Sequence, residues 1–494
     1  MTIQTSVVDS APHDAQNSGP NDRTDSEVNP VISAISPQFA DDTLALTFSK
    51  LHADNLRFTA AWGKWSIWDS FRWRRDDTMR VFDLARCVCR SASSTCRDEY
   101  LAIRVASAPT VAAVERLARA DRRHAATVDQ WDADPWSLNT PAGVVDLRTS
   151  VIRPAMREDY CTKITTVAPG GPCTLWLEFL RRITNGDVEM QRFLQRICGY
   201  ALTGDTRENA LFFLYGTGAN GKTVFISTIS GVFGDYAKTA PIEAFIVSQS
   251  DRHPTDLAGL QGARLVTAIE TEEGRRWAES KLKAITGGDR IAARFMRQDF
   301  FEYSPQFKLL IAGDHKPSIR TVDEAMRRRF NLLPFTVTIP KKDRDPKLTE
   351  KLRAEWGGIL QWAIEGCRAW QQEGLNPPSI VTEATSDYLA DEDTLGRWLE
   401  ERCNLGKQNS ATIAELFGDW SKWCGDNGEH RGSQKSFSQN LEARGFTRVR
   451  SAGARGFRGL DLNYSDWVDP SDSKACAQRK VVGIPVTLVT DSKV

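Results

Sequence analysis

The feature that most constrains this 494-residue chain is a glycine-rich octapeptide, Gly216-Thr-Gly-Ala-Asn-Gly-Lys-Thr223. The apolar run at 211–215 predicts a buried strand before it, and the apolar residues at 224–229 predict a helix after it. A strand, a glycine loop, a lysine and a helix in this order are typical of a phosphate-binding loop, because glycines let backbone N–H groups face phosphate oxygens. A chance glycine turn would not come with all four parts, so the sequence predicts a nucleotide-hydrolysing α/β core.

Each part of this loop has an expected task if the ligands are ATP and Mg²⁺. Lys222 would bridge the β- and γ-phosphates, and Thr223 would ligate the metal ion. The N-terminus of the following helix would add positive potential at the phosphates. The expected nucleotide contacts are Gly216, Thr217, Gly218, Ala219, Asn220, Gly221, Lys222 and Thr223.

Further strand-like apolar runs lie at 265–269 and 309–312, and the first of these two is followed by the glutamates Glu270, Glu272 and Glu273. A buried strand that ends in acids can supply one carboxylate for Mg²⁺ and another that polarises the attacking water. Glu270 stands at the strand end and is expected to act in catalysis and in holding Mg²⁺, and Glu272 is the second catalytic candidate. The other interpretation is a strand that ends in solvated glutamates.

The pattern along the chain predicts a central domain with smaller domains on either side, since 494 residues exceed one typical domain. Tryptophans between 62 and 73 flank a predicted hairpin turn at Asp69-Ser70. They are expected to form the core of a small domain, with base stacking as the alternative. The expected boundaries are 1–37 for a disordered tail, 38–165 for an α+β N-terminal domain, 174–340 for the ATPase domain, 341–392 for a helical extension, 393–465 for a winged-helix-like domain and 466–494 for a weakly ordered tail.

Net charge gives no indication of nucleic acid, because 64 lysines and arginines balance 64 acids. Any DNA affinity must therefore come from local basic surface. The stretch 431–460 has seven basic residues and a single acid, Glu442. Its expected DNA contacts are Arg448, Arg450, Arg455 and Arg458, and a protein-docking surface is the alternative. No signal peptide or membrane-spanning run is recognised, so a cytoplasmic location is expected.

Further motifs follow the second strand in order. They are Lys281-Leu-Lys-Ala-Ile-Thr-Gly-Gly-Asp-Arg290, Arg294, Pro305-Gln-Phe-Lys308, His315-Lys-Pro317 and Asp323-Glu-Ala-Met-Arg-Arg-Arg-Phe330. Together they resemble the helicase half of the phage/plasmid primase-helicases, a superfamily 3 branch that includes poxvirus and satellite-phage relatives. The resemblance covers about 50–465. It implies an AAA+-like P-loop ATPase core, a homo-hexameric ring and ATP-driven 3′-to-5′ travel on single-stranded DNA.

Positions carried over from the family extend the candidate site. Asp314 would sense the γ-phosphate. Either Arg328 or Arg329 would reach the ATP of the neighbouring subunit and neutralise charge that develops in phosphoryl transfer. A hairpin within 290–304 would point into the ring channel, with a solvated hairpin as the alternative. The expected DNA contacts of this hairpin are Arg294, Arg297 and Gln298.

Asp314 departs from the family pattern, which usually has asparagine there. An ionised aspartate cannot donate a hydrogen bond and repels phosphate, which puts the rate of hydrolysis in question. Residues 1–165 show no recognisable polymerising site, so a separate primase is an expected partner beside single-stranded and forked DNA. The sequence predicts an ATP-dependent DNA helicase in the replication of a phage, plasmid or integrated mobile element. The alternatives are an ATP-regulated DNA-binding initiator or loader, and an AAA+ remodeller that does not act on DNA.

Overall fold

The computed structural model describes residues 38–247, 255–270, 274–294, 300–319, 322–451 and 454–463. The tails expected at 1–37 and 466–494 lie outside the described residues. In the described part of the chain, no helix is long and apolar enough to cross a membrane. Contacts divide the chain into two units, Met1–Ala53 with Thr78–His124 and Asp54–Asp77 with Ala125–Val494. The region 38–165 is therefore shared between the two units.

The described residues of the first unit are helical. Phe48, Ala85 and Val114 are fully buried between its helices, and Nε2 of His124 lies 3.1 Å from the hydroxyl of Ser49. The helices are α1 (Asp41–His52), α2 (Arg80–Ser94), α3 (Glu99–Val105) and α4 (Ala108–Ala118). Three-residue 3-10 helices in the chain are η1 (Ala60–Trp62), η2 (Arg122–His124), η3 (Val128–Gln130), η4 (Arg157–Asp159), η5 (Gly234–Tyr236), η6 (Ile242–Ala244) and η7 (Lys341–Asp343).

Two small antiparallel sheets precede the large sheet of the second unit. The first contains β1 (Leu56–Thr59), β2 (Lys64–Trp68) and β3 (Trp73–Arg75), and the second β4 (Ser137–Thr140), β5 (Gly143–Asp146) and β6 (Val151–Arg153). Trp68 pairs with Trp73, which confirms the hairpin predicted around Asp69-Ser70. Trp73 is 1% exposed and Trp65 is buried as well, so these two rings belong to a core and do not offer open faces to bases.

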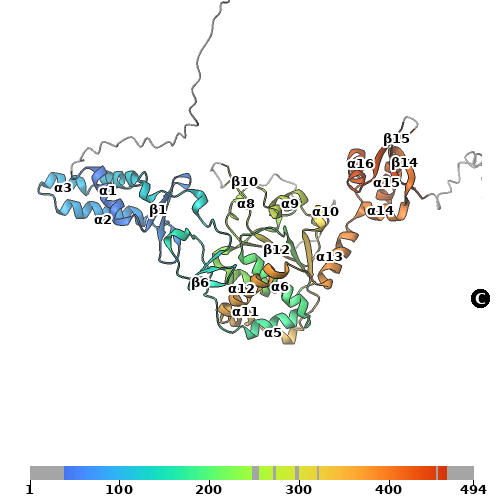
Figure 1. Ribbon diagram of the computed structural model, residues 1–494, viewed down its shortest axis with the longest axis horizontal. Coiled ribbons are helices and arrows are strands. Elements are labelled where there is room, and N and C mark those ends of the chain that lie inside the picture. The colour runs from blue at the N-terminus through green and yellow to red at the C-terminus, as the bar shows by residue number, and fades with distance from the viewer. Residues whose placement is uncertain are drawn as a thin grey trace, which may run out of the picture. The chain divides into compact units, whose positions relative to one another are not determined.

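A five-stranded parallel sheet forms the centre of the second unit, which makes it a mixed α/β structure (Figure 1). The spatial order is β13-β7-β12-β9-β8, and every neighbouring pair is parallel. The strands are β7 (Leu211–Tyr215), β8 (Ala237–Thr239), β9 (Leu265–Glu270), β12 (Lys308–Gly313) and β13 (Phe330–Pro334). The predicted apolar strands at 211–215, 265–269 and 309–312 are confirmed.

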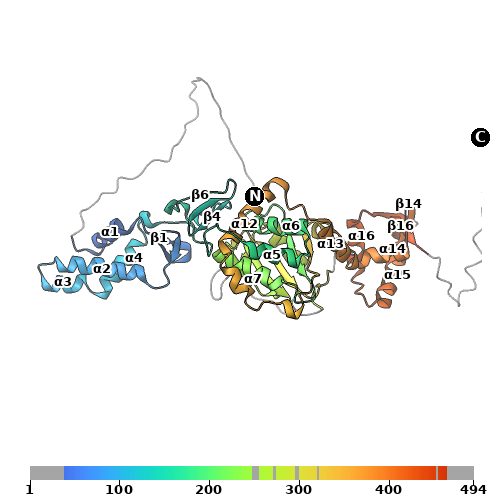
Figure 2. The ribbon, with the colours of Figure 1, turned by 90° about the horizontal axis from the view of Figure 1, so that it is seen from below.

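Both faces of this sheet are covered. Along β12, Leu310 and Ala312 join one apolar cluster, whereas Leu309 and Ile311 join another. Parallel strands buried on both faces read as continuous apolar runs, which is why the sequence revealed them. In Figure 2, α6 (Val188–Leu202) and α12 (Trp356–Glu373) lie together, and their residues belong to the first cluster. Other helices of the second unit are α5 (Thr174–Ile183), α7 (Lys222–Phe233), α8 (Thr255–Ala258), α9 (Glu279–Gly287), α10 (Glu324–Arg327), α11 (Leu348–Arg353) and α13 (Ser379–Asp391).

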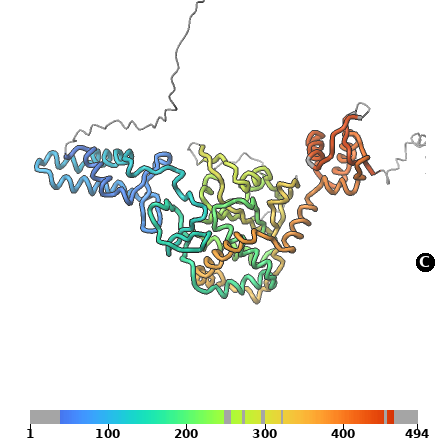
Figure 3. The backbone as a smooth tube through the Cα atoms, viewed as in Figure 1, coloured from blue at the N-terminus to red at the C-terminus, as the bar shows by residue number. Residues whose placement is uncertain are grey.

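A small α+β domain follows α13 along the chain (Figure 3). Its elements are α14 (Thr394–Arg402), β14 (Cys403–Thr412), α15 (Ile413–Asp426), α16 (Gln434–Ala443), β15 (Thr447–Ser451) and β16 (Ala454–Leu462). The antiparallel sheet has the order β14-β16-β15. Trp398, Leu416 and Phe457 are fully buried in its core. The strand β14 was not predicted from the sequence.

Candidate active site at the carboxyl edge of the parallel sheet

The glycine-rich loop connects β7 to α7, and β7 lies between β12 and β13. The chain passes close to other groups here. A Cβ atom on Gly216 would lie 2.2 Å from the carbonyl oxygen of Phe335, and one on Gly221 would lie 2.5 Å from Cγ2 of Ile183. Gly221 also has a φ of 88°, in the region that favours glycine. These two glycines are therefore required by space and by backbone conformation, independently of any ligand.

Lys222 begins α7, and its side chain is only 7% exposed. Its Nζ atom donates to the carbonyl oxygen of Gly216 at 2.5 Å and to Oδ1 of Asn220 at 3.0 Å. A third contact joins it to Oδ1 of Asp314 at 2.9 Å. An ammonium group has three donors, so these three acceptors satisfy it fully. A buried charge needs such partners, which explains how the lysine is held over the loop.

Asp314 comes directly after β12, beside the strand that leads into the loop. Its side chain is 53% exposed, in contrast to the lysine it contacts. The carboxylate oxygens also lie near the loop backbone, since a Cβ atom on Gly218 would be 3.9 Å from Oδ2. The structure thus brings Asp314 and Lys222 together, although 92 residues separate them in sequence. A negative oxygen already accepts one hydrogen bond of Lys222 at this edge of the sheet.

The strand β9, whose last residue is the first of the predicted acidic residues, ends at the same side of the sheet as β7 and β12. Gly313 pairs with Tyr215 on one side and with Glu270 on the other, so β7, β9 and β12 all end at one level. Glu270 is the last residue of β9, and Thr223 lies in the first turn of α7. Ligands of open α/β sheets bind at the carboxyl ends of the strands, so this edge has the placement that a nucleotide site needs. Glu272 lies outside the described residues.

The two adjacent arginines, Arg328 and Arg329, differ in their exposure to solvent. Arg328 is exposed. Arg329 is 8% exposed, and its guanidinium donates to Oγ1 of Thr286 at 3.2 Å and to the carbonyl oxygen of Ala325 at 2.9 Å. Burial, together with the neighbouring Arg328, lowers the pKa of Arg329 from its usual value. Arg329 is thus held by contacts within its own chain, and Arg328 is the one whose side chain faces solvent.

These arginines lie at the opposite edge of the sheet from the loop. They precede β13, whose first residue pairs with Leu211, and the amide of Leu211 donates to the carbonyl oxygen of Arg329 at 2.7 Å. The five residues of β7 separate this edge from the loop. At about 3.3 Å per residue the strand spans roughly 16 Å. The structure therefore does not bring Arg328 to the Lys222 site of the same chain.

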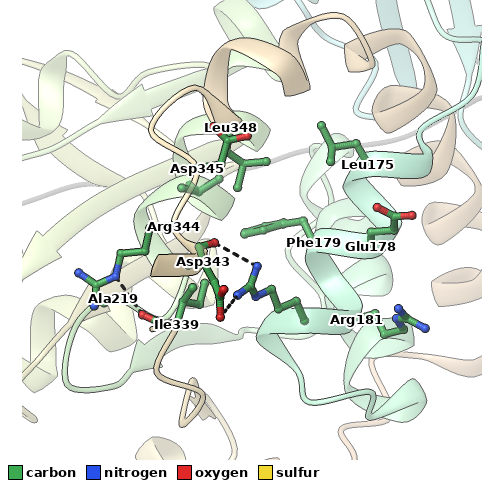
Figure 4. A pocket seen from close by; sticks show the side chains of 13 residues that line it. Leu175, Glu178, Phe179, Arg181, Ala219, Ile339, Asp343, Arg344, Asp345 and Leu348 are labelled. Atoms are coloured by element: carbon green, nitrogen blue, oxygen red, sulfur yellow. Dashed lines mark hydrogen bonds and ion pairs between the residues drawn. The ribbon is translucent and has the colours of Figure 1, made fainter. Parts of the chain in front are cut away.

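A pocket of about 720 Å³ adjoins the loop on the side of α5 (Figure 4). Figure 4 shows Phe179 of α5 directed toward the segment that carries Asp343, with Arg181 pointing away. Arg182 closes one wall, because its guanidinium lies 3.4 Å from the carboxylate of Asp343. The lining residues are Leu175, Glu178, Phe179, Arg181, Arg182, Ala219, Gly221, Val224, Ile339, Asp343, Arg344, Asp345 and Leu348. The sequence did not predict this pocket.

The candidate DNA residues that the structure describes lie in or next to two separate pairs of antiparallel strands. In the first, β10 (Ile291–Ala293) pairs with β11 (Phe301–Tyr303), which confirms the two paired strands predicted within 290–304. The guanidinium of Arg294 lies 4.7 Å from the ring centre of Phe300, which is 60% exposed. Arg297 and Gln298 lie outside the described residues.

The second hairpin joins β15 to β16. Arg450 and Arg455 are exposed and face each other directly across the two strands. Like charges in this position are destabilising, so the pair costs stability unless an anion lies nearby. Arg458 is also exposed, whereas Arg448 forms an ion pair with Glu442 at 2.5 Å. All four predicted arginines are therefore exposed, and the charge of Arg448 is partly neutralised by Glu442.

Two family models match the chain. Residues 45–185 match a family described as D5 N terminal like, and residues 214–329 match a family of unknown function. The putative helicase L207/L206 of Acanthamoeba polyphaga mimivirus is 24% identical over 325 residues, covering 60% of this chain and 34% of the relative. The putative helicase 022R of Frog virus 3 is 27% identical over 282 residues, covering 53% and 29%. The chain thus spans about a third of the length of these curated relatives.

Solved structures give a looser similarity. An apo structure of the NrS-1 C terminal region has a TM-score of 0.45 and 12% identity, with 84% of this chain and 99% of that chain covered. A second apo form has a TM-score of 0.44 and 10% identity. Because both TM-scores are below 0.5, this likeness supports no inference about the site. Both viral relatives, in contrast, are described as putative helicases.

Proposed function

We propose that this chain, a member of the D5-like primase-helicase family, is an ATP-driven DNA helicase of superfamily 3. The observation that carries the proposal is Lys222, buried at the carboxyl edge of a parallel sheet between a glycine loop and the ends of β9 and β12. A buried cation in this position is suited to bind the phosphates of a nucleotide.

The residues present fit ATP. Lys222 and the loop would hold the β- and γ-phosphates, and the pocket beside Phe179 would take the base and ribose. Thr223 and Glu270 would hold Mg²⁺, which neutralises phosphate charge during hydrolysis when bound. Glu270 would also orient the attacking water. The pocket is continuous with the loop through Ala219 and Gly221, which line both.

The arginine that completes the site would come from a neighbouring subunit. Arg328 is exposed and lies at the far edge of the sheet from its own Lys222, which favours action on another copy of the chain. Arg329 would instead support the backbone beneath it through Thr286 and Ala325. A ring of identical subunits, expected to be a hexamer, supplies such a neighbour to every site.

DNA would contact two regions. The β10–β11 hairpin with Arg294 would face single-stranded DNA in the ring, and travel from 3′ to 5′ is expected from the family. The order helix, strand, helix, helix, strand, strand from α14 to β16 is that of a winged helix, with β15 and β16 as the wing. The exposed Arg450, Arg455 and Arg458 would contact phosphates there. A separate primase would supply primers.

A second candidate function is an ATP-regulated initiator or loader that binds DNA but unwinds little. The contact between Lys222 and Asp314 favours it, because a carboxylate beside the expected γ-phosphate would slow hydrolysis. The two functions are separated by measuring ATP turnover and strand displacement on forked DNA with the purified full chain. Turnover that DNA stimulates, with displacement of the strand, supports the helicase. ATP and DNA binding without displacement supports the loader, and no binding of ATP contradicts both.

A further inference from the structure

The end of α13 and the residues after it form hydrogen bonds with several parts of the domain that contains the parallel sheet. Within α13, the hydroxyl of Thr385 accepts from the amide of Leu332 in β13 at 2.9 Å. The hydroxyl of Tyr388 donates to the carbonyl oxygen of Pro317, three residues after Asp314. The carboxylate of Glu392 accepts from the amide of Ile319 at 2.7 Å. The segment that follows Asp314 is therefore fastened to the helix that leads into the C-terminal domain.

Asp393, the next residue along the chain, forms ion pairs with two arginines. Its carboxylate lies 3.2 Å from the guanidinium of Arg327 and also forms an ion pair with Arg444. Oδ1 accepts from the amide of Gly396 at 3.0 Å and so caps α14. The Asp393 side chain is 12% exposed. One nearly buried carboxylate thus joins an arginine of the central domain to an arginine of the C-terminal domain.

Each arginine stands beside a residue with a proposed task. Arg327 immediately precedes Arg328, and both lie at the end of α10, which has only four residues. Arg444 follows α16 and leads into β15, whose arginines are the proposed wing contacts. A displacement of either guanidinium would change the environment of a carboxylate that has little water around it. The side chains of Arg327 and Arg444 are 40% and 28% exposed, whereas the carboxylate that they share is 12% exposed. Loss of either ion pair would leave this carboxylate with one charged partner, so the positions of the two arginines are linked.

We propose that Asp393 is a positioning residue that couples DNA contact at the C-terminal domain to the placement of Arg328. This rests on the proposed function, since it needs an ATPase that DNA stimulates. DNA bound at the wing would shift or fix Arg444, and Asp393 would transmit the change to Arg327 and the adjoining Arg328. Coupling between two sites of one protein typically changes affinity about 5- to 150-fold.

Asp393→Asn separates this task from the helix cap. Asparagine caps helices about as well as aspartate, so α14 should keep its cap while both ion pairs are lost. Arg327→Gln removes only the central-domain partner, and Arg444→Gln removes only the C-terminal one. Arg402→Gln is the matched control, because Arg402 forms an ion pair with Asp419 inside the C-terminal domain at 2.7 Å. The full chain is used throughout, and the probe is a forked DNA.

The measurement is the ratio of ATP turnover with and without the forked DNA, alongside the KM for ATP and the melting temperature. We expect Asp393→Asn, Arg327→Gln and Arg444→Gln each to lower the ratio at least about 5-fold, with KM for ATP unchanged. The double variant Arg327→Gln/Arg444→Gln should lower the ratio no further than either single variant, because each single change already interrupts the same path through Asp393. Arg402→Gln should keep the wild-type ratio, and Arg444→Lys should recover part of it.

A purely structural role would give the opposite pattern. The coupling is overturned if the three variants keep the wild-type ratio, or if the ratio falls only in proportion to the melting temperature and equally in Arg402→Gln. Because Arg327→Gln and Arg444→Gln each leave Asp393 one partner, they test the proposal even where Asp393→Asn folds poorly. A wild-type chain with no ATP turnover would instead contradict the proposed function, and the coupling with it.

Discussion

The ammonium group of Lys222 and the carboxylate of Asp314 lie 2.9 Å apart at the carboxyl edge of the parallel sheet. The lysine is nearly buried, whereas half of the aspartate side chain faces solvent. A carboxylate that accepts from this lysine uses a hydrogen bond that a phosphate oxygen would need. In the proposed site this carboxylate would also repel the phosphate, so the pair would set a balance between binding ATP and releasing it.

Asp314→Asn should bind ATP more tightly and turn it over faster. The amide keeps the shape of the side chain but removes the competing charge and can donate to a phosphate. One well-placed donor contributes at most about 2–4 kcal/mol at a transition state. Single-turnover hydrolysis and ATP binding by calorimetry would measure both effects. A slower variant would show that the carboxylate itself takes part in the reaction.

Lys222→Ala should lose ATP turnover by at least about 100-fold, since the loss of one donor to developing charge commonly costs this much. Lys238→Ala is the control, because Lys238 is exposed on β8 at the edge of the same sheet. Steady-state hydrolysis and ATP binding would be measured for both. Near-normal turnover by the Lys222 variant would refute the proposed site.

Arg328→Ala and Arg329→Ala should fail in different ways. Loss of Arg328 should abolish turnover with little change in melting temperature, because the side chain is exposed. Loss of Arg329 should lower the free energy of unfolding by about 1–3 kcal/mol, since its contacts with Thr286 and Ala325 are buried. Mixing Arg328→Ala with Lys222→Ala should restore some activity, because one interface of a mixed assembly then has both groups. If the activity of each mixture is only the weighted average of the two variants' own activities, the active sites are not shared between subunits.

Glu270→Gln should keep ATP binding and lose turnover. The amide is close in size to the carboxylate but cannot polarise the attacking water as a base. ATP affinity and hydrolysis rate, measured together, separate the two effects. Comparison with Glu272→Gln decides the order of the two acids, and greater damage from the Glu272 change would reverse the assignment.

Phe179→Leu should weaken ATP binding roughly 2- to 10-fold if the ring contacts the base, since an aromatic contact is worth about 0.5–1.5 kcal/mol. Leucine keeps most of the apolar volume that α5 buries. Leu177→Ala is the control, because Leu177 is 47% exposed on the same helix and does not line the pocket. Equal ATP affinity in the wild-type chain and the Phe179 variant would place the base elsewhere.

The sequence predicted three strands of the parallel sheet, β7, β9 and β12, because each is a largely apolar run, and the loop because its residues are contiguous. It did not predict β8 or β13, and β8 is short and mostly polar. It did not predict β14, whose residues Cys403–Thr412 are mostly polar and only partly covered. The run 174–202 also divides into two helices, since Asn185 has a φ of 52° and Asp187 caps a new start at the amide of Met190. Its apolar spacing continues across the break, so the spacing gives no sign of where one helix ends and the next begins.

The parts of the site that the sequence did not predict depend on contacts between residues far apart in the chain. No local pattern indicates that Asp314 would pair with Lys222, or that Asp393 would lie between Arg327 and Arg444. Apolar residues spaced along a helix have the same pattern whether they fill a core or line a pocket, so Phe179 could not be told apart from Phe193. The difference between Arg328 and Arg329 is likewise a matter of the fold, because the residues themselves are identical.

The separation of Lys222 from Arg328 restricts the symmetry of any assembly that completes the proposed site. The two half-sites lie at opposite edges of one sheet. Joining one half-site to the other requires unlike surfaces to meet, which is a heterologous contact and leaves an unmatched half-site at each end of a dimer. Only a closed ring satisfies every copy, and a rotation that failed to close would give a filament. The number of subunits would then follow from the angle between neighbours.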